Sequence, residues 1–252
     1  MTTFIETGHA KNVANFEDLI SFCIGYGATY NPVNANKKIP ALQAKQTAAL
    51  AAIQTVKTTK TAFDNSTNAR EIIFETLKKL STRIVNALEA TTATTQTIDD
   101  AKTVNRKMQG KRAGSIPKVA TANATTVVVP NIAPTVTTIS VSQQSFDGLI
   151  DNFTKLIQIV STEPAYLPNE TELKVATLNT LLTNLKAANT AVINATTTNS
   201  NGRIARNIAL YAADTGMVDI ALEVKKYVKS LFGATSPQYK QVSGLQFTQP
   251  KK

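Results

Sequence analysis

The chain has 252 residues, a length that accommodates one large domain or two units of about 100 residues each. Hydrophobic residues make up 42%, enough for a buried core, whereas charged residues make up only 17% and the net charge is +10. One cysteine and one histidine exclude an internal disulfide and a zinc site built from several Cys and His ligands.

The N-terminal residues lack the basic and apolar regions of a signal peptide, and no apolar run is long enough to span a bilayer. We therefore expect a cytoplasmic protein without a membrane span. His9 lies in a polar stretch and is expected at the surface. Cys23 lies on an apolar helix face and is expected to be a buried small hydrophobic residue.

Three helices are predicted in the first part of the chain, because apolar residues recur there at three- and four-residue spacing. The first stripe runs from Phe16 to Ile24, the second from Leu42 to Phe63 and the third from Ile73 to Leu88. Asn, Ser and Thr residues gather at 64–67, and this cluster predicts the turn between the second and third helices.

Residues 111–142 differ in composition from the segments on either side. They are rich in Thr, Ala and Val, contain three prolines, and form part of a stretch without Asp or Glu that runs from Ala101 to Phe146. This composition predicts a flexible or extended linker. The alternative is a β-hairpin, with strands at Thr125–Val129 and Val136–Val141 and a turn at Pro130–Pro134.

Three further helices are predicted after the linker. Their apolar stripes run from Phe146 to Val160, from Leu178 to Val192 and from Ile204 to Leu231, with a turn at Asn199–Gly202. Gly216 lies inside the last of these stripes and is expected to kink or split that helix.

The two helical segments carry matching motifs in the same order. Tyr30-Asn31-Pro32 matches Tyr166-Leu167-Pro168 at a separation of 136 residues, and Phe16–Ile20 matches Phe146–Ile150 in a shifted register. These matches predict an internal duplication. The expected fold is all-α, with two tandem, elongated three-helix bundles at residues 1–110 and 143–252 and a linker at 111–142.

Four blocks of the sequence resemble a family of proteins predicted from Bacteroidetes genomes. The resemblance covers both helical segments and implies a bacterial, Thr-rich, internally duplicated helical protein. The family carries no assigned activity, so no functional residue is transferred from it. The blocks that carry the resemblance are Asn15–Ile20, Asn68–Glu71, Leu77–Leu88 and Ser236–Leu245.

Motifs for phosphate binding, dinucleotide binding or nucleophilic catalysis do not occur, and we predict a protein that is not an enzyme and uses no cofactor or metal. Glu71 and Glu75 have the spacing of half a carboxylate metal site, but the Glu-x-x-His motif that completes such sites is missing. Arg70 and Arg206 occupy matching positions after the predicted turns. Helix capping or carboxylate pairing is favoured over anion binding for both arginines.

Basic residues gather near the end of each helical segment without acidic neighbours. A solvated basic surface is the favoured interpretation, and contact with an anion or nucleic acid is the alternative. The residues concerned are Lys102, Arg106, Lys107, Lys111, Arg112, Lys225, Lys226 and Lys229.

Three functions are compatible with this sequence. The favoured one is a structural or interaction protein that self-associates or acts as a scaffold, with a homo-oligomer or another protein as the partner. The second is a basic protein that associates with nucleic acid without sequence specificity. The third is a small-molecule binder or an enzyme with a site in the groove between the two helical segments.

Overall fold

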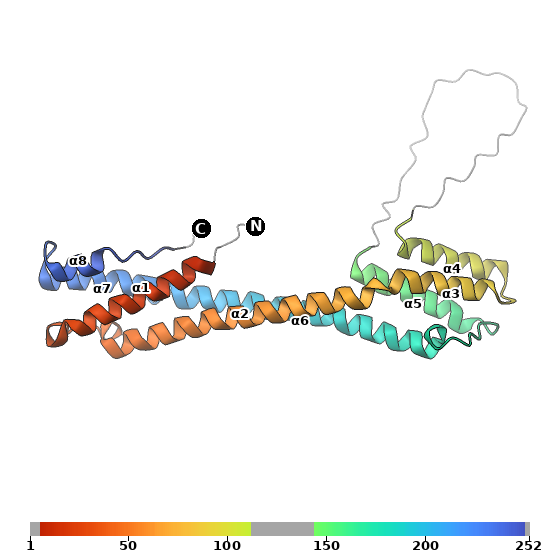
Figure 1. Cartoon of the computed structure of the whole chain (residues 1–252), viewed down its shortest axis with the longest axis horizontal. Helices are drawn as coiled ribbons and strands as arrows, with labels where there is room; N and C mark the ends of the chain where they lie inside the picture. The colour runs from red at the N-terminus through yellow and green to blue at the C-terminus, as the bar shows by residue number, and fades with distance from the viewer. Residues whose placement is uncertain (1–5, 112–143, 250–252) are drawn as a thin grey trace, which may run out of the picture. The chain divides into compact units, whose positions relative to one another are not determined.

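The computed structural model describes residues 6–111 and 144–249. These residues form helices and loops without strands, which confirms the all-α prediction (Figure 1). The linker and the alternative β-hairpin at 125–141 lie outside the described residues. The α-helices are α1 (Glu6–Gly25), α2 (Ile39–Glu75), α3 (Leu77–Glu89), α4 (Thr95–Met108), α5 (Phe146–Thr162), α6 (Val175–Tyr211), α7 (Met217–Phe232) and α8 (Pro237–Ser243).

Short 3-10 segments precede the two longest helices. The segment η1 (Gly27–Thr29) follows α1, η2 (Ala35–Lys37) precedes α2, and η3 (Thr171–Leu173) precedes α6. We call residues 6–111 the first half and residues 144–249 the second half. Each half therefore has four α-helices instead of the three predicted. The additional helices are α4 and α8, whose buried residues are too few to make a conspicuous apolar stripe in the sequence.

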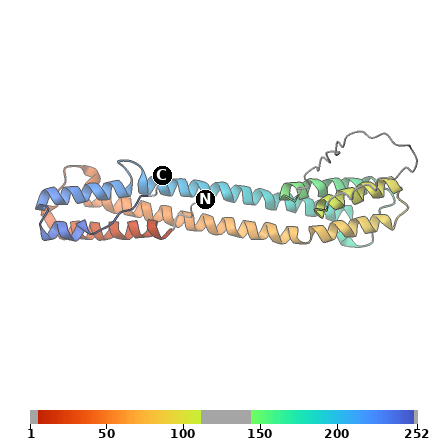
Figure 2. The same cartoon turned by 90° about the horizontal axis from the view of Figure 1, so that it is seen from above.

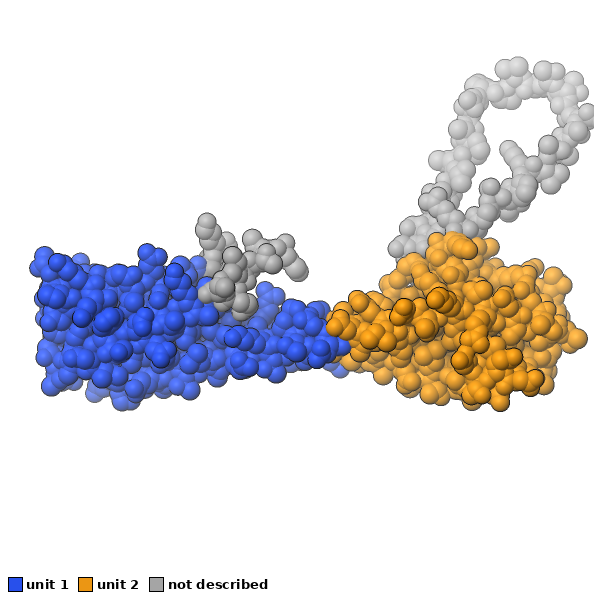
Figure 3. Space-filling model, in the orientation of Figure 1, with its two compact units in different colours: residues 1–65, 193–252 blue, residues 66–192 orange. Residues whose placement is uncertain are grey.

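The chain divides into two compact units that do not coincide with the expected bundles at 1–110 and 143–252 (Figure 3). Unit 1 combines residues 1–65 with 193–252, and unit 2 consists of residues 66–192. Each unit therefore draws on both helical segments. The physical reason is that the turns expected at 64–67 and 199–202 do not form: both clusters lie inside the continuous helices α2 and α6.

The core of unit 1 lies between α1 and the N-terminal part of α2 on one side and the helices α7 and α8 on the other (Figures 1 and 2). Phe16, Leu19 and Leu42 pack there with Val224 and Val228, and all five are fully buried. Since these residues come from both ends of the chain, unit 1 closes only when the first and second helical segments meet.

The core of unit 2 forms where α3 and α4 pack against α5 and the start of α6 (Figure 2). Leu77, Leu88 and Met108 from the first segment meet Phe153 and Leu185 from the second, again without exposed surface. Unit 2 thus repeats the arrangement of unit 1, with helices from both segments around one core.

The sequence cluster at 199–202 marks a close approach of helices instead of a turn. A Cβ atom on Gly202 would lie 3.3 Å from Thr59 Oγ1, and the hydroxyl of Thr59 hydrogen-bonds with Asn199 Oδ1 at 3.2 Å. Ile204 and Ile208 were expected on the buried stripe but are 55% and 61% exposed. Each lies two residues, or about 200°, from a buried position of α6, and therefore on the opposite face.

Gly216 splits the last predicted helix, as expected. α6 ends at Tyr211, and Gly216 is the N-cap residue of α7. A Cβ atom at Gly216 would lie 2.6 Å from both the N and O atoms of Ala212. Only glycine fits between the two helices here.

Corresponding elements recur at fixed separations along the chain. α2 and α6 each have 37 residues and begin 136 residues apart, at Ile39 and Val175, and η2 and η3 are also 136 residues apart. The burial pattern relates α1 to α5 at a separation of 137: the equivalent pairs Phe16/Phe153 and Cys23/Val160 have nearly equal exposure. The sequence match of Phe16–Ile20 to Phe146–Ile150 has a separation of 130, which is seven residues, or about two helical turns, shorter.

None of the helices in the described ranges is long and apolar enough to cross a membrane.

Candidate functional site

Two equivalent loops each place a buried tyrosine next to a proline. The Tyr30 hydroxyl donates a hydrogen bond to the carbonyl oxygen of Lys37 at 2.7 Å, and the Tyr166 hydroxyl donates to that of Leu173 at 3.0 Å. Burial raises the pKa of both phenols, that of Tyr166 to about 12. Both tyrosines therefore remain neutral donors at ordinary pH, and each fixes its loop to the following 3-10 segment.

The same loops hold apolar side chains in solvent. Val33 is 99% exposed in the first loop and Leu167 is 83% exposed in the second. An exposed aliphatic side chain is common on protein surfaces by itself. Here the two lie on loops of matching construction, one in each unit, which makes the loops candidates for contact with a partner.

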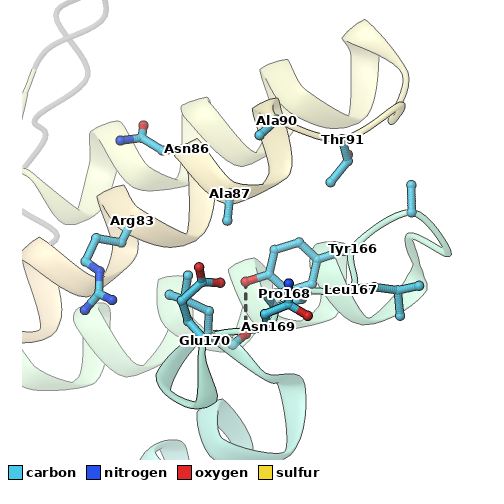
Figure 4. A pocket seen from close by; sticks show the side chains of 12 residues that line it. Arg83, Asn86, Ala87, Ala90, Thr91, Tyr166, Leu167, Pro168, Asn169 and Glu170 are labelled. Carbon is cyan, nitrogen blue, oxygen red and sulfur yellow. Dashed lines mark hydrogen bonds between the residues drawn. The ribbon is translucent and has the colours of Figure 1, made fainter.

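A pocket of about 500 Å³ adjoins Leu167 in unit 2. Arg83, Asn86 and Ala87 of α3 form one wall, and the loop from Ala165 to Glu170 forms the other (Figure 4). The pocket combines apolar side chains with amide groups and charges of both signs. This lining suits a peptide segment or another mixed polar and apolar ligand.

Arg83, the positively charged residue that lines the pocket, also forms an ion pair. Arg83 contacts Glu172 of η3, and the side chains of the two residues are 51% and 68% exposed. The Glu170 carboxylate points from the loop toward α3 (Figure 4). Because water screens exposed pairs, Arg83 remains available to a ligand carboxylate at a small energetic cost.

Arg70 is half-buried in the interior of α2 in unit 2 instead of lying after a turn. Its Cζ atom is 3.9 Å from the centre of the Phe146 ring, and its Nη1 donates a hydrogen bond to Asn189 Oδ1 at 3.1 Å. Asn189 Nδ2 in turn donates to Asp147 Oδ1 at 2.7 Å. Arg70 therefore links α2, α5 and α6 within this unit.

Arg206 lies in unit 1 and is 2% exposed. Its Nε and Nη2 atoms donate to Asn207 Oδ1 at 3.2 and 3.0 Å. Burial of this extent leaves little of the guanidinium accessible to an anion from solution.

The predicted basic residues fall into two groups. Lys102 to Lys111 belong to unit 2 and Lys225 to Lys229 to unit 1, and Arg112 lies outside the described residues. Lys102 pairs with Glu89 at 2.5 Å, and this hydrogen bond raises its pKa. Lys225 Nζ donates to the carbonyl oxygens of Ser243 and Leu245, and burial lowers its pKa.

The other basic residues have different surroundings. Lys229 Nζ lies 5.7 Å from the centre of the Tyr239 ring, and Arg106 and Lys107 are half-buried. Lys102, Lys111, Lys226 and Lys229 are exposed. Four of the seven described basic residues therefore extend into solvent, two in each unit.

His9 is buried, which corrects the expectation of a surface residue. Its Nδ1 lies 2.6 Å from the Tyr211 hydroxyl, and Asn12 contacts the same hydroxyl at 3.3 Å. The polar sequence around His9 hid this position because its partners lie about 200 residues away. Cys23 is buried as predicted, and burial raises its pKa to about 12.

Within the described ranges, no three His, Cys, Asp or Glu side chains come close enough to hold a metal ion. The chain matches no protein-family model, no curated protein and no solved structure. The resemblance to the Bacteroidetes family therefore remains a prediction. Sequence reasoning missed the pocket and the exposed residues Val33 and Leu167, although it did find the repeated Tyr-x-Pro motif that positions them.

Proposed function

We propose that this chain is a non-enzymatic structural protein that acts as a scaffold and contacts protein partners, among them further copies of itself, through its two Tyr-x-Pro loops. The observation that carries the proposal is the exposure of Val33 and Leu167 on loops that are fixed by equivalent tyrosine hydrogen bonds. A fixed loop loses little conformational entropy on binding, so an apolar side chain at its tip contributes efficiently to affinity.

We also propose that the two halves descend from one duplicated unit. Support comes from the equal length of α2 and α6, from the constant separation of 136 residues, and from the matching bonds of Tyr30 and Tyr166 to a carbonyl seven residues on. Duplication explains why similar loops occur twice. Two similar loops on one chain would give a bivalent scaffold, whose avidity exceeds the affinity of either loop.

Light scattering of the full chain over a range of concentrations tests the interaction proposal. We expect a defined oligomer in the wild type, a weaker one in Val33→Asn or Leu167→Asn, and a mass near the monomer in the double variant. Ile72→Asn is the matched control, because Ile72 is 70% exposed on α2 and outside both loops.

Two outcomes would count against the proposed contacts. A wild-type monomer at high concentration would remove self-association, and an oligomer unchanged by the double substitution would place the contact elsewhere. Retention of nucleic acid that declines steeply with added salt would instead favour the basic residues as the binding surface.

A further inference from the structure

Each unit contains an ion pair at the same place, and the signs of the charges are reversed between the units. In unit 2, Arg83 of α3 contacts Glu172 of η3. In unit 1, Lys37 of η2 contacts Glu223 of α7, with Nζ and Oε2 3.0 Å apart. Both pairs join a helix of one half to the 3-10 segment of the other half.

The two helix positions are equivalent. α3 and α7 align at a separation of 140 residues, where Leu77 matches Met217 and Ile84 matches Val224, all four without exposed surface. The same alignment places Arg83 on Glu223. A cation and an anion therefore occupy one position of the repeated structure.

The 3-10 segments carry the opposite pattern. η2 and η3 align at a separation of 136, which puts Lys37 and Glu172 one residue apart along the segment. Among the neighbouring residues, Lys38 follows Lys37 and Glu170 precedes Glu172, while Lys174, the equivalent of Lys38, follows η3 and leaves that segment with a net negative charge. One segment is therefore locally basic and the other locally acidic.

The reversed charges make unlike halves attract each other and like halves repel each other. If a half paired with a second copy of itself from another chain in the same geometry, Arg83 would face Lys37 and Lys38. In the corresponding pairing of two second halves, Glu223 would face Glu170 and Glu172. Like charges brought into contact repel, whereas the opposite charges of both native pairs attract.

We propose that these two ion pairs select the pairing of the first half with the second and disfavour the pairing of either half with its own copy from another chain. The partner excluded is the identical half of a second molecule. This inference rests on the proposed duplication, because only related halves compete for the same surface. The selection works at the interface between α3 and η3 in unit 2 and between α7 and η2 in unit 1.

The expected effect is moderate. The side chains of the two pairs are between 20% and 68% exposed, so screening by water limits each contact. Exposed pairs typically shift an equilibrium by a factor of about two to five. Since a wrongly paired dimer replaces attraction by repulsion at several contacts, we expect a combined preference of about tenfold.

Charge exchange in the full chain separates this selection from ordinary surface pairing. Lys37→Glu with Glu223→Lys keeps opposite charges within both native pairs, but it also makes both like-half pairings attractive. Arg83→Glu with Glu172→Arg does the same from the other unit. All four substitutions together again keep the native pairs and restore repulsion in both like-half pairings.

All four proteins of this comparison carry Val33→Asn and Leu167→Asn, which removes association through the loops, and the protein without charge exchange serves as the wild type. The measurement is the fraction of intermolecular species formed on refolding from denaturant at a fixed concentration, determined by size-exclusion chromatography with light scattering. We expect about tenfold more of these species in either double variant than in the wild type, and a return to the wild-type fraction in the quadruple variant. Equal fractions in all four proteins would overturn the proposal. A quadruple variant that misassembles as much as the doubles would also overturn it.

A further measurement shows whether the variants are equally stable. Urea unfolding of each folded protein should give similar midpoints, since the native pairs are retained, and a variant that fails this comparison is replaced by the other double. Association through Val33 and Leu167 is removed in all four proteins and does not contribute to the measured fraction. A failure of the loop contacts therefore leaves this test intact, and the reverse also holds.

Discussion

Tyr30 and Tyr166 show how one residue can define a local structure in both halves. Each phenol is buried and donates to the carbonyl of the residue seven positions on, so the loop between them closes over the ring. Tyr30 also packs edge-to-face against Tyr227, with ring centres 5.5 Å apart. A buried hydroxyl without an acceptor would be costly, and this cost ties the loop conformation to the 3-10 segment that supplies the carbonyl.

Cys23 links residue chemistry to the stability of unit 1 at alkaline pH. Burial raises its pKa to about 12 in the folded chain, whereas an unfolded thiol titrates near 8.5. Between these values the unfolded chain releases a proton that the folded chain retains, so stability declines as pH rises above about 8.5. Tyr30, which lies in the same unit and whose pKa burial also raises, adds to the decline above about pH 10 for the same reason.

We predict that Cys23→Ala flattens this decline. Urea unfolding between pH 7 and 10 under reducing conditions should give a smaller slope of unfolding free energy against pH, by up to about 1.4 kcal/mol per pH unit. The lost side-chain volume lowers stability equally at every pH and leaves the slope alone. Ser21→Ala, on the exposed face of α1, is the control. Parallel curves for wild type and Cys23→Ala would contradict the prediction.

At the scale of elements, glycine positions illustrate what the sequence can and cannot reveal. Gly216 was expected to interrupt a helix, and it does so because the chain passes too close to Ala212 for any side chain. Gly202 and Asn199 were expected to form a turn, but they lie in the interior of α6 and allow α2 to approach. Local composition marks both glycines as special, yet only the neighbouring helix determines which role each has.

The two glycines make a matched pair of substitutions. Gly216→Ala should lower the unfolding free energy by about 1–3 kcal/mol, because the new methyl group overlaps backbone atoms that cannot rotate away. Gly202→Ala should change it by less than about 1 kcal/mol, since its only close neighbour under 3.4 Å is the Thr59 hydroxyl and alanine gains in helix propensity. Chemical denaturation measures both. Equal losses at the two sites would show that close approach at Gly216 is not the cause.

At the scale of the whole molecule, the sequence predicts the helices better than their pairing. The apolar stripes that contain Phe16, Leu42 and Leu178 identify faces that are indeed buried. An apolar stripe indicates that a helix face is buried, but it does not indicate which helix packs against that face. Because the halves have similar stripes, each is compatible with a bundle of its own or with helices from both halves. Because α2 and α6 continue as helices where turns were expected, each unit combines helices from both halves. Local sequence composition did not reveal that these helices are continuous.

Sequence features of the candidate site were likewise recognisable only in part. The Tyr-x-Pro repeat was recognised in the sequence as part of a predicted duplication, and the structure places its two copies in loops with matching hydrogen bonds. The pocket beside Leu167 was not predictable, since one wall comes from Arg83 and its neighbours in the other half of the chain. The reversed charges at Arg83 and Glu223 became comparable only after burial had fixed the register of α3 and α7.

Because each unit contains helices from both halves, we predict that the protein stays assembled when the chain is cleaved between the halves. We place a protease site after Pro130 of the full chain, fold the protein and then cleave it. Each core contains residues of both halves: α1 packs with α7 and α8, and α4 packs with α5. The two fragments should therefore stay together and elute as one species that retains the helical circular dichroism of the uncut protein.

Separation of the fragments on dilution would instead indicate that each half folds by itself. If each half closed into its own bundle, cleavage would release two independent helical species of about half the mass, and dilution would drive them apart. Since separation of the halves observed here exposes Phe16, Leu77, Phe153 and Val224 to water, it should require denaturant instead of dilution. The concentration of urea that separates the fragments should therefore coincide with the loss of helical signal, and fragments that part while still helical would refute the shared cores.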